Sequence, residues 1–520
     1  MRKHKGFTYE WYDYDALMTY AAIDNYVTSA ILAAMWPTLN ERRDYTFFKR
    51  GQAQVVKTPS IRNEQLEVKK LALDFVCDME VAGMAYDIPA NRRMHQAMLE
   101  DLAKTEDQIF TAIGKRIDLN SGAALGDFLY RERGFDVPLQ TKSGGDSTSG
   151  DALKALHKIH EHDWLKDIIK RNDVHAMHGN FIKTYVEDWV KSDGRIHPSY
   201  NLFGTSSHRI SSSDPNLLNL PRGYYGYNIR ELYITIPPMA FLTFDFSSCE
   251  VKILAALCKD EAMMDACAKG WDFHSFTASM IAGVPYEDFV AIVKDEHHPE
   301  HKKYKGIRQD AKATTFGLLY GSTVNGIAMN LGKTLEETQK IVDTYFRLFP
   351  KVKDFIEDCH KMALANQFVF SPFGQRKMEY GAQDVFRGTA VYNAALRNSQ
   401  NVSIQGPAST LGLIVFAKLN EELKKIGGRA ICTVYDSVEI EVPMNRMAEA
   451  IELGFYMMDD WPVANFDWLD FKIGADAEIG WDWGNVHGVK RGITQEKCEE
   501  ILSAANEEKY VTSRLLLAAA

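Results

Sequence analysis

The sequence predicts an α+β fold in which helical segments surround a mainly antiparallel sheet. Residues 241–258, FLTFDFSSCEVKILAALC, start with an apolar run typical of a buried strand and continue into a helical pattern. Residues 429–443, RAICTVYDSVEIEVP, are rich in β-formers and are interrupted at Tyr435-Asp436-Ser437, which predicts a hairpin turn. Residues 304–332 and 336–365 have the periodicity of long helices.

The N-terminal part of the chain is predicted to be mostly helical. Residues 13–36 combine helical periodicity with strong helix formers, and a second helical region begins near Glu67. That region stops at the turn AGMAYDIPAN, and the helical pattern resumes near Asn91. The Gly/Ser-rich stretch 141–150 predicts a loop, and short polar turns begin near Arg195.

Composition indicates a soluble, cytoplasmic chain with no membrane partner. The 520 residues suffice for roughly three or four domain-sized units. No apolar run approaches the roughly 20 residues that span a bilayer, and the N-terminus lacks the apolar core of a secretory signal. The seven cysteines form no CxxC pair, as expected in a reducing compartment. The net charge of −10 does not exclude nucleic acid, because phosphate binding depends on where Lys and Arg cluster.

Two aspartates lie in apolar strand-like segments, where a carboxylate is costly unless it is paired or binds a metal. Asp245 follows FLTF, and Asp436 follows CTVY. Either one alone is explained by hydrogen bonds to backbone at a strand end. If the two strands are adjacent, both carboxylates can hold divalent ions at one edge, with Mg²⁺ the expected ion and Mn²⁺ the alternative.

One predicted helix carries cations and aromatics on a single stripe. Arg308, Lys312, Phe316 and Tyr320 follow one another at intervals of four, which drifts only about 40° per step on an α-helix. Such a stripe can hold a triphosphate at one end and stack a base at the other. An amphipathic helix with solvated cations and buried aromatics gives the same pattern. A polar cluster at 204–222, which includes Arg209, suits contacts to sugar and phosphate.

Six motifs in order resemble those of family A DNA polymerases, the polymerase I type, over about residues 60 to 490. Residues 205–221 resemble the TxTGRxSSxxPNLQNxP signature, and the run Asn228-Ile229-Arg230 precedes DFSSCEVKILA, which is similar to motif A. RQDAKATTFGLLYG satisfies RxxxKxxxFGxxYG of motif B. Arg397, Asn401 and Gln405-Gly406 match the helix before motif C, and YDS stands where motif C has HDE.

The resemblance implies a template-directed DNA polymerase that extends a primer 3′-OH with dNTPs by two-metal-ion nucleotidyl transfer. Asp245 and Asp436 are the implied catalytic metal ligands, assisted by the backbone carbonyl of Phe246, and Glu250 is the implied steric gate against ribose. The remaining nucleotide-binding positions are His274, Arg308, Lys312, Phe316 and Tyr320. The implied DNA-binding positions are Thr205, Arg209, Asn216, Asn219, Arg230, Arg397, Asn401 and Gln405.

The implied fold is the right-hand polymerase fold, with a palm built on an antiparallel sheet and helical fingers and thumb. The expected boundaries are an exonuclease remnant at 1–62, thumb at 63–200, palm at 201–265 and 396–489, fingers at 266–395, and a tail at 490–520.

Four positions depart from the family pattern. His208 replaces a glycine, Leu218 a glutamine, and Ser248 the glutamine of motif A. Tyr435 and Ser437 flank Asp436 where His and Glu are usual. Ser437 removes a carboxylate near the metals, so metal affinity or choice is expected to differ, while activity is expected to remain.

Residues 20–28, YAAIDNYVT, resemble the third motif of a DEDDy 3′–5′ exonuclease domain. Tyr20 and Asp24 would share a helix face, with Asp24 on a metal and Tyr20 positioning water; a surface helix is the alternative. We expect a phage-type replicase with a truncated exonuclease domain, located in the host cytoplasm if phage-encoded. A separate exonuclease polypeptide and other replisome proteins are then the expected partners.

Two other functions remain open at this point. A single-subunit RNA polymerase often reads HDS in motif C, close to YDS here, but Glu250 and Phe316-Gly317 oppose it. A non-catalytic DNA-binding replication protein is opposed by the retention of both aspartates together with Arg308 and Lys312.

Overall fold

The computed structural model describes residues 67–504, apart from 142, 206 and 384–387. It also describes residues 27, 30 and 34 and the strands β1 (Asp44–Lys49) and β2 (Gln52–Lys57), which pair with each other. Most of the helix expected over 13–36 and the tail after 504 lie outside the described residues.

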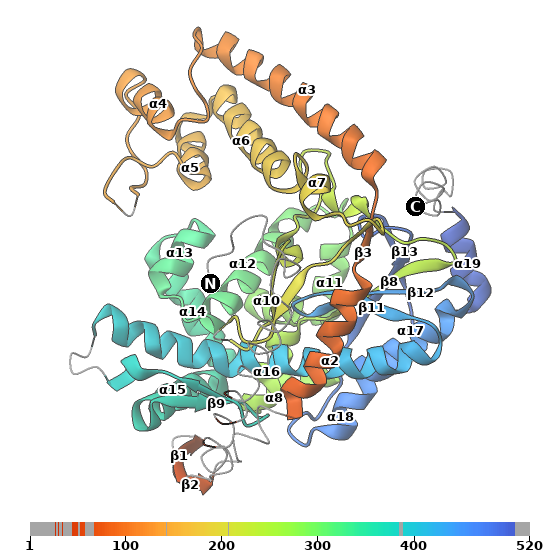
Figure 1. Ribbon diagram of the computed structural model, residues 1–520. Helices are drawn as coiled ribbons and strands as arrows, with labels where there is room; N and C mark the ends of the chain where they lie inside the picture. The colour runs from red at the N-terminus through yellow and green to blue at the C-terminus, as the bar shows by residue number, and fades with distance from the viewer. Residues whose placement is uncertain are drawn as a thin grey trace.

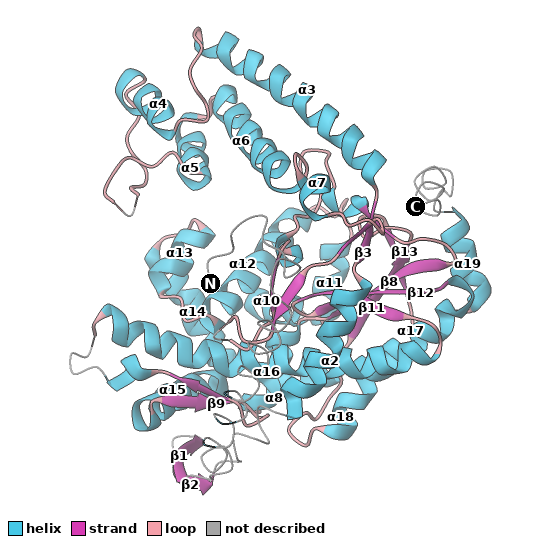
Figure 2. Cartoon of the chain, viewed as in Figure 1, coloured by secondary structure: helices cyan, strands magenta, loops and turns pink. Residues whose placement is uncertain are grey.

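The antiparallel sheet that the sequence predicted is present and has five strands. Its order is β11 (Arg429–Val434), β12 (Ser437–Pro443), β8 (Met239–Phe246), β13 (Ala475–Gly480) and β14 (Val486–Val489). Every neighbouring pair in this order is antiparallel. Figure 2 shows these strands gathered on one side of the molecule with helices around them.

The two faces of this sheet differ in chemistry because successive side chains of a strand point to opposite sides. On one face Phe244 lies 5.5 Å from Phe455, and Phe246 lies 5.8 Å from Phe416, measured between ring centroids. These partners belong to α17 (Met447–Phe455) and α16 (Ala390–Lys425), which cover that face. The opposite face carries the polar residues of the same strands.

The helix α8 (Cys249–Cys258) follows β8 after two residues, as the run FLTFDFSSCEVKILAALC predicted. The expected hairpin at 429–443 is also confirmed, with Tyr435 and Asp436 as its two-residue turn.

Both long helices expected from periodicity are broken, so these two predictions were wrong in detail. Residues 304–332 form α12 (His301–Leu319) and α13 (Val324–Leu331), separated at Gly321, whose φ of +70° ends the helix. Residues 336–365 form α14 (Leu335–Leu348) and α15 (Pro350–Asn366), because Pro350 cannot continue a helix but is accommodated at a first turn.

A helical arm projects from the sheet region (Figure 1). It is built from α3 (Ile88–Ile113), α4 (Gly122–Gly126), the π-helix η3 (Asp127–Glu132), α5 (Gly150–His160) and α6 (Asp163–Phe181). Residues 141 and 143–149 form a loop up to the start of α5, as predicted, apart from a single bridge between Gln140 and Asp146. The arm has a hydrophobic cluster of its own, drawn from residues between 109 and 169.

The remaining elements connect the arm, the sheet and the helical region that contains α12–α15. They are α2 (Glu67–Ala82), β3 (Met84–Tyr86), α7 (Tyr185–Trp189), β4 (Arg195–Ile196), β5 (Ser199–Asn201), β6 (Ser211–Ser213), η4 (Leu217–Asn219), η5 (Ile229–Leu232), β7 (Tyr233–Ile234), α9 (Glu261–Ala268), α10 (Phe273–Ala282), α11 (Tyr286–Lys294), β9 (Phe368–Phe370), β10 (Arg376–Met378), η6 (Tyr380–Gln383), η7 (Met444–Arg446), η8 (Tyr456–Asp460), α18 (Trp461–Asn465) and α19 (Gln495–Ala504).

Among the described residues, α16 is the single helix that is long and apolar enough to cross a membrane, and the bent pair α10–α11 passes only if taken together. In α16, 78% of the apolar window is buried inside the protein. That burial is typical of a core helix.

Candidate active site

The structure brings Asp245 and Asp436 to one end of the central sheet. Asp245 is the penultimate residue of β8, and Asp436 lies in the turn between β11 and β12. Because β12 pairs with β8, Ser437 stands directly opposite Asp245. The backbone N–H of Phe246 donates to the carbonyl of Asp436 at 3.0 Å, which ties the turn to the end of β8. The adjacency expected from the two apolar segments is therefore present.

The turn that carries Asp436 has an unusual backbone. Tyr435 adopts φ +61°, a conformation that two-residue hairpin turns require and that a bulky residue rarely takes. Its ring lies 5.1 Å from the guanidinium carbon of Arg209, a cation–π contact. This contact links the turn to the polar segment 204–222.

The positive charges of Arg209 and Arg222 compensate the two carboxylates only in part. Burial, followed by the nearby charge of Asp436, raises the pKa of Asp245 to about 7, and Arg222 only partly opposes this rise. Desolvation by the surrounding protein also raises the pKa of Asp436, although its side chain still reaches solvent. Asp245 Oδ1 is buried and has no hydrogen-bond partner among the residues that the structure describes. A cation placed between these carboxylates would remove this cost.

The donor set fits a hard divalent ion. In the part of the chain that the structure describes, no group of three or more His, Cys, Asp or Glu side chains is arranged to hold a metal by itself. Mg²⁺ is commonly bound by one or two carboxylates together with substrate phosphates rather than by a complete protein cage. The carboxylates of Asp245 and Asp436, with the unpartnered Oδ1 of Asp245, match that mode of binding.

Glu250, in the first turn of α8, is the centre of a second cluster, which joins three residues that were predicted separately. It accepts a hydrogen bond from the Tyr320 hydroxyl at 2.8 Å and forms an ion pair with Arg209. Burial raises the pKa of Glu250, and Arg209 and Tyr320 oppose the rise. Burial, and then the negative charge of Glu250, raises the pKa of Tyr320 to about 12, while a hydrogen bond with Gln405 of α16 lowers it.

The cationic stripe of α12 lies beside α10. Arg308 Nε donates to Asp272 Oδ2 and to Ser275 Oγ, both at 3.0 Å. Lys312 Nζ lies 6.0 Å from the centroid of the Phe316 ring. The predicted stripe is thus present as far as Phe316, and Tyr320 stands at the C-cap of the helix.

His274 is buried next to this stripe, with its ring 5.4 Å from that of Phe316. Burial lowers the pKa of His274 to about 4, with Lys312 and Arg308 adding to the decrease. Its Nδ1 atom has no hydrogen-bond partner among the described residues. A neutral imidazole beside two cations suits recognition of an anion.

The segment 204–222 packs against α16. Ser409 Oγ of α16 donates to the His208 carbonyl at 3.2 Å, and Thr205 Oγ1 donates to the Arg209 carbonyl at 2.7 Å. His208 has φ +61°, which explains why a glycine suits this position in the family pattern. The loop is thereby held so that Arg209 reaches Glu250.

Other predicted DNA-binding residues surround this loop. Asn216 accepts from the Leu218 N–H at 3.1 Å and caps η4, while Asn219 at the end of η4 is exposed. Arg230 donates to the Leu220 carbonyl at 3.3 Å, and its guanidinium carbon lies 4.5 Å from the Trp483 ring.

Two more predicted residues project from α16 near the break after α12. Asn401 Oδ1 is buried without a partner, and Arg397 lies against Gly321. The remaining predicted pair, Tyr20 and Asp24, lies outside the described residues.

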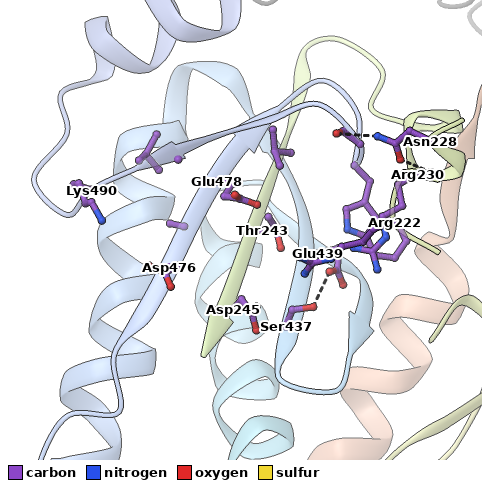
Figure 3. Close-up of a pocket in the computed structure, with 17 residues that line it drawn as sticks. Arg222, Asn228, Arg230, Thr243, Asp245, Ser437, Glu439, Asp476, Glu478 and Lys490 are labelled. Atoms are coloured by element: carbon purple, nitrogen blue, oxygen red, sulfur yellow. Dashed lines mark hydrogen bonds between the residues drawn. The ribbon is translucent and has the colours of Figure 1, made fainter. Parts of the chain in front are cut away.

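Sequence reasoning missed several polar residues that line a cavity of about 590 Å³ on the polar face of the sheet (Figure 3). The available signal was the occurrence of acids at every second residue in SVEIEVP and in ADAEIG, which is the period of a β-strand. The register places Asp476 opposite Asp245 on the side away from β12. The missed residues are Arg222, Thr243, Glu439, Asp476 and Glu478.

Comparisons with known proteins agree with the motifs. A family model described as DNA polymerase family A matches residues 89–485. The chain is 29% identical over 420 residues to a thermostable DNA polymerase I from Thermus aquaticus, covering 80% of this chain and 48% of that protein. It is 30% identical over 421 residues to DNA polymerase I from Mycobacterium leprae, covering 79% of this chain and 43% of that protein.

The fold is also similar to a solved structure titled as the POL domain of Pol1 from M. smegmatis in complex with DNA primer-template and dNTP. The TM-score is 0.72 at 26% sequence identity, and the match covers 82% of this chain and 73% of that chain. The chain spans about half the length of the curated relatives that it matches.

Proposed function

Because this chain belongs to DNA polymerase family A, we propose that it extends a DNA primer with dNTPs under the direction of a template strand. The meeting of Asp245 and Asp436 at one end of an antiparallel sheet carries this proposal. Phosphoryl transfer depends mainly on positioning and on stabilising charge at the reacting oxygens, and this pair offers the place where cations can do so.

Asp245 and Asp436 would hold two divalent ions, Mg²⁺ by the chemistry of their oxygens, with Mn²⁺ as a substitute. When bound, such ions activate the attacking 3′-hydroxyl and stabilise the departing pyrophosphate. The carbonyl of Phe246, next to Asp245, is the third proposed oxygen donor.

Arg308, Lys312 and His274 would bind the triphosphate of the incoming nucleotide. In the structure Arg308 donates to Asp272 and Ser275, so it is held in place before the nucleotide arrives. Phe316 and Tyr320 would lie beside the new base pair, offering ring faces for stacking.

Glu250 would select dNTPs against rNTPs. Its carboxylate is fixed by Tyr320 and Arg209 and therefore cannot easily swing away from a bulkier sugar. This arrangement supports the choice of a DNA polymerase over an RNA polymerase.

The contacts to primer and template would come from the segment 204–222 and from α16. These two elements pack together beside Glu250, and short polar side chains there suit backbone and minor-groove contacts. The proposed residues are Thr205, Arg209, Asn216, Asn219, Arg230, Arg397, Asn401 and Gln405.

We assign the thumb to 63–200, the palm to 201–265 and 396–489, and the fingers to 266–395. The arm α3–α6 supports the first assignment, and the strands β8, β11, β12 and β13 support the second. The helices α10–α15 support the third.

The test is extension of a labelled primer–template with Mg²⁺, using dNTPs and rNTPs in parallel. Wild type should extend with dNTPs alone, whereas Asp245→Ala and Asp436→Ala should lose extension by at least about 10³-fold while remaining folded. Asp470→Ala is the control, because this exposed carboxylate pairs with Lys259 outside the site. A folded wild-type chain that neither extends the primer nor releases pyrophosphate would contradict the proposal.

A separate 3′–5′ exonuclease polypeptide belongs to the same proposal and is supported by the resemblance of residues 20–28 to an exonuclease motif. The purified chain should leave a mismatched 3′ end in place, and addition of the partner should remove it. Efficient removal by the chain alone would refute this part.

A further inference from the structure

Ser437 occupies the position on β12 that faces Asp245 and that carries a glutamate in the family motif. Its Oγ lies 2.9 Å from Glu439 Oε1 and 3.2 Å from the Val434 carbonyl. A hydroxyl has one proton to donate, and a carboxylate is a stronger acceptor than a backbone carbonyl. The Ser437 hydroxyl is therefore expected to donate to Glu439, which is also the shorter contact. Ser437 therefore links the position of the missing glutamate to another carboxylate two residues further along the strand.

Glu439 points into the polar face beside the aspartates rather than into the helices. Residues 437 and 439 share a face because of the period of two along a strand. The register sets Glu439 opposite Thr243, so it is the diagonal neighbour of Asp245 across the two strands. Figure 3 shows Glu439 next to Ser437 within the same cavity as Asp245.

The Glu439 side chain is buried yet incompletely satisfied. It is 1% exposed, and its Oε2 atom has no hydrogen-bond partner within the described part of the chain. Burial raises the pKa of Glu439 to about 8, and the hydrogen bond with Ser437 and the charge of Arg230 only partly oppose this rise. Among the described residues, no cation lies within ion-pair distance of Glu439. A buried carboxylate oxygen without a partner is costly and is expected where a ligand completes its surroundings.

Glu441, the next acid on the same face, provides a contrast. It is equally buried but forms ion pairs with Arg195, at 2.9 Å, and with Arg429. Its charge is therefore compensated within the fold, which marks a structural role.

We propose that Glu439, held by Ser437, adds its negative charge beside Asp245 as an outer partner of the divalent-ion site and so replaces the glutamate that residue 437 lacks. This inference rests on the proposed function. It predicts that the ion affinity of the chain depends on Glu439 as well as on Asp245 and Asp436. The competing explanation is a purely structural Glu439 that neutralises Arg230, whose Nε is also buried without a partner.

The test measures Mn²⁺ binding to the intact chain by electron paramagnetic resonance of free Mn²⁺, together with thermal unfolding in EDTA. Glu439→Gln should raise the Mn²⁺ dissociation constant roughly tenfold or more, the range seen when outer partners of metal ligands are removed. Glu441→Gln is the matched control, which should lower Tm but leave the dissociation constant within about twofold of wild type, because the ion pairs that it breaks lie outside the metal site.

A dissociation constant unchanged in Glu439→Gln would overturn the inference and establish the structural role. Should that variant fold poorly, the double variant Ser437→Glu with Glu439→Gln decides, because it returns a carboxylate to the facing position. Recovery of Mn²⁺ affinity supports the proposal, and no recovery in a folded double variant overturns it. A wild-type chain that binds no Mn²⁺ and extends no primer would instead refute the proposed function.

Discussion

At the scale of single residues, the carboxylates of the polar face impose a cost that a bound cation would relieve. Burial, and then the nearby charges of Asp436 and Asp476, raise the pKa of Asp245 to about 7, far above its ordinary 3.8. The folded state therefore holds the proton of Asp245 more tightly than the unfolded chain does. The contribution of Asp245 to the free energy of unfolding is fully present below its pKa of 3.8 in the unfolded chain. It is lost as the pH rises through the folded-state pKa of about 7.

Asp245→Asn should accordingly stabilise the metal-free protein at pH 8 while abolishing primer extension. We expect the free energy of unfolding in EDTA to rise on the order of 1–2 kcal/mol at pH 8, because the variant removes an uncompensated charge. The gain should be smaller at pH 5, where the carboxyl of the folded wild type is protonated while that of the unfolded chain is still ionised. Urea unfolding at the two pH values measures both quantities.

The control for this prediction is Asp470→Asn, which changes an exposed carboxylate outside the site and should alter stability by no more than about 0.5 kcal/mol at either pH. Equal or lower stability of Asp245→Asn at pH 8 would show that Asp245 is compensated in the fold.

Phe316 offers a second prediction at this scale. The resemblance to the family implies that Phe at this position leaves dideoxynucleotides without a hydroxyl to replace their missing 3′-OH. Phe316→Tyr should therefore increase incorporation of ddNTPs relative to dNTPs by at least about 100-fold, the value of a hydrogen bond in a desolvated site. Competition between ddNTPs and dNTPs in primer extension measures this ratio, and an unchanged ratio would remove Phe316 from the nucleotide site.

Residues that belong to linear motifs were predictable, whereas residues brought together by strand pairing were not. Asp245, Arg308 and Lys312 stand in runs whose spacing alone suggests chemistry. Asp476 and Glu439 come to line the same cavity as Asp245 only through the registers of β13 and β12 with β8. The register depends on how the strands pair in the folded protein and cannot be predicted from the sequence of either strand alone.

At the scale of elements, the break between α12 and α13 positions Tyr320. Gly321 ends the helix with φ +70°, and a Cβ built there would lie 2.8 Å from Arg397 Cγ of α16. The helix periodicity of residues 304–332 hid this break, although the Gly-Ser pair after Tyr320 was a readable stop signal. Pro350 gave the same kind of signal between α14 and α15.

Gly321→Ala should destabilise the protein and also reduce discrimination against rNTPs. A positive φ costs alanine about 1 kcal/mol of stability relative to glycine. The new methyl group would also press against Arg397, and the resulting backbone shift should move Tyr320 away from Glu250. Thermal unfolding and the ratio of rNTP to dNTP incorporation measure the two effects.

Gly332→Ala is the control, because it introduces alanine at a positive φ without a new contact to a neighbouring side chain. Gly332 ends α13 with φ +64°, and nothing lies within 4 Å of a Cβ built there. This variant should lose about 1 kcal/mol but keep wild-type sugar discrimination. The same discrimination in both variants would mean that Gly321 does not act through Tyr320.

At the scale of the whole molecule, the outer part of the arm has a hydrophobic core of its own, whereas the base of the arm shares a cluster with the sheet. Among the described residues, the cluster that includes Ile109, Phe128, Leu153 and Ile168 draws only on residues 109–169. The main cluster joins the sheet to α8, α16 and α17. An element with its own small core opens more readily than one embedded in a large core.

Hydrogen exchange should therefore show the arm as the less stable unit in the free protein. Amides of α5 and of α6 up to Ile169 should exchange with an opening free energy at least about 2 kcal/mol below that of β8 and β12. Under the proposed function, primer–template should slow exchange in the arm, because the arm would close on the duplex, and should change β8 little. Exchange measured by mass spectrometry, with and without DNA, gives both comparisons, and an unspecific polyanion such as heparin is the control for charge alone. Equal protection of arm and sheet in the free protein would show that the two cores unfold together, and protection by heparin equal to that by primer–template would remove the arm from duplex recognition.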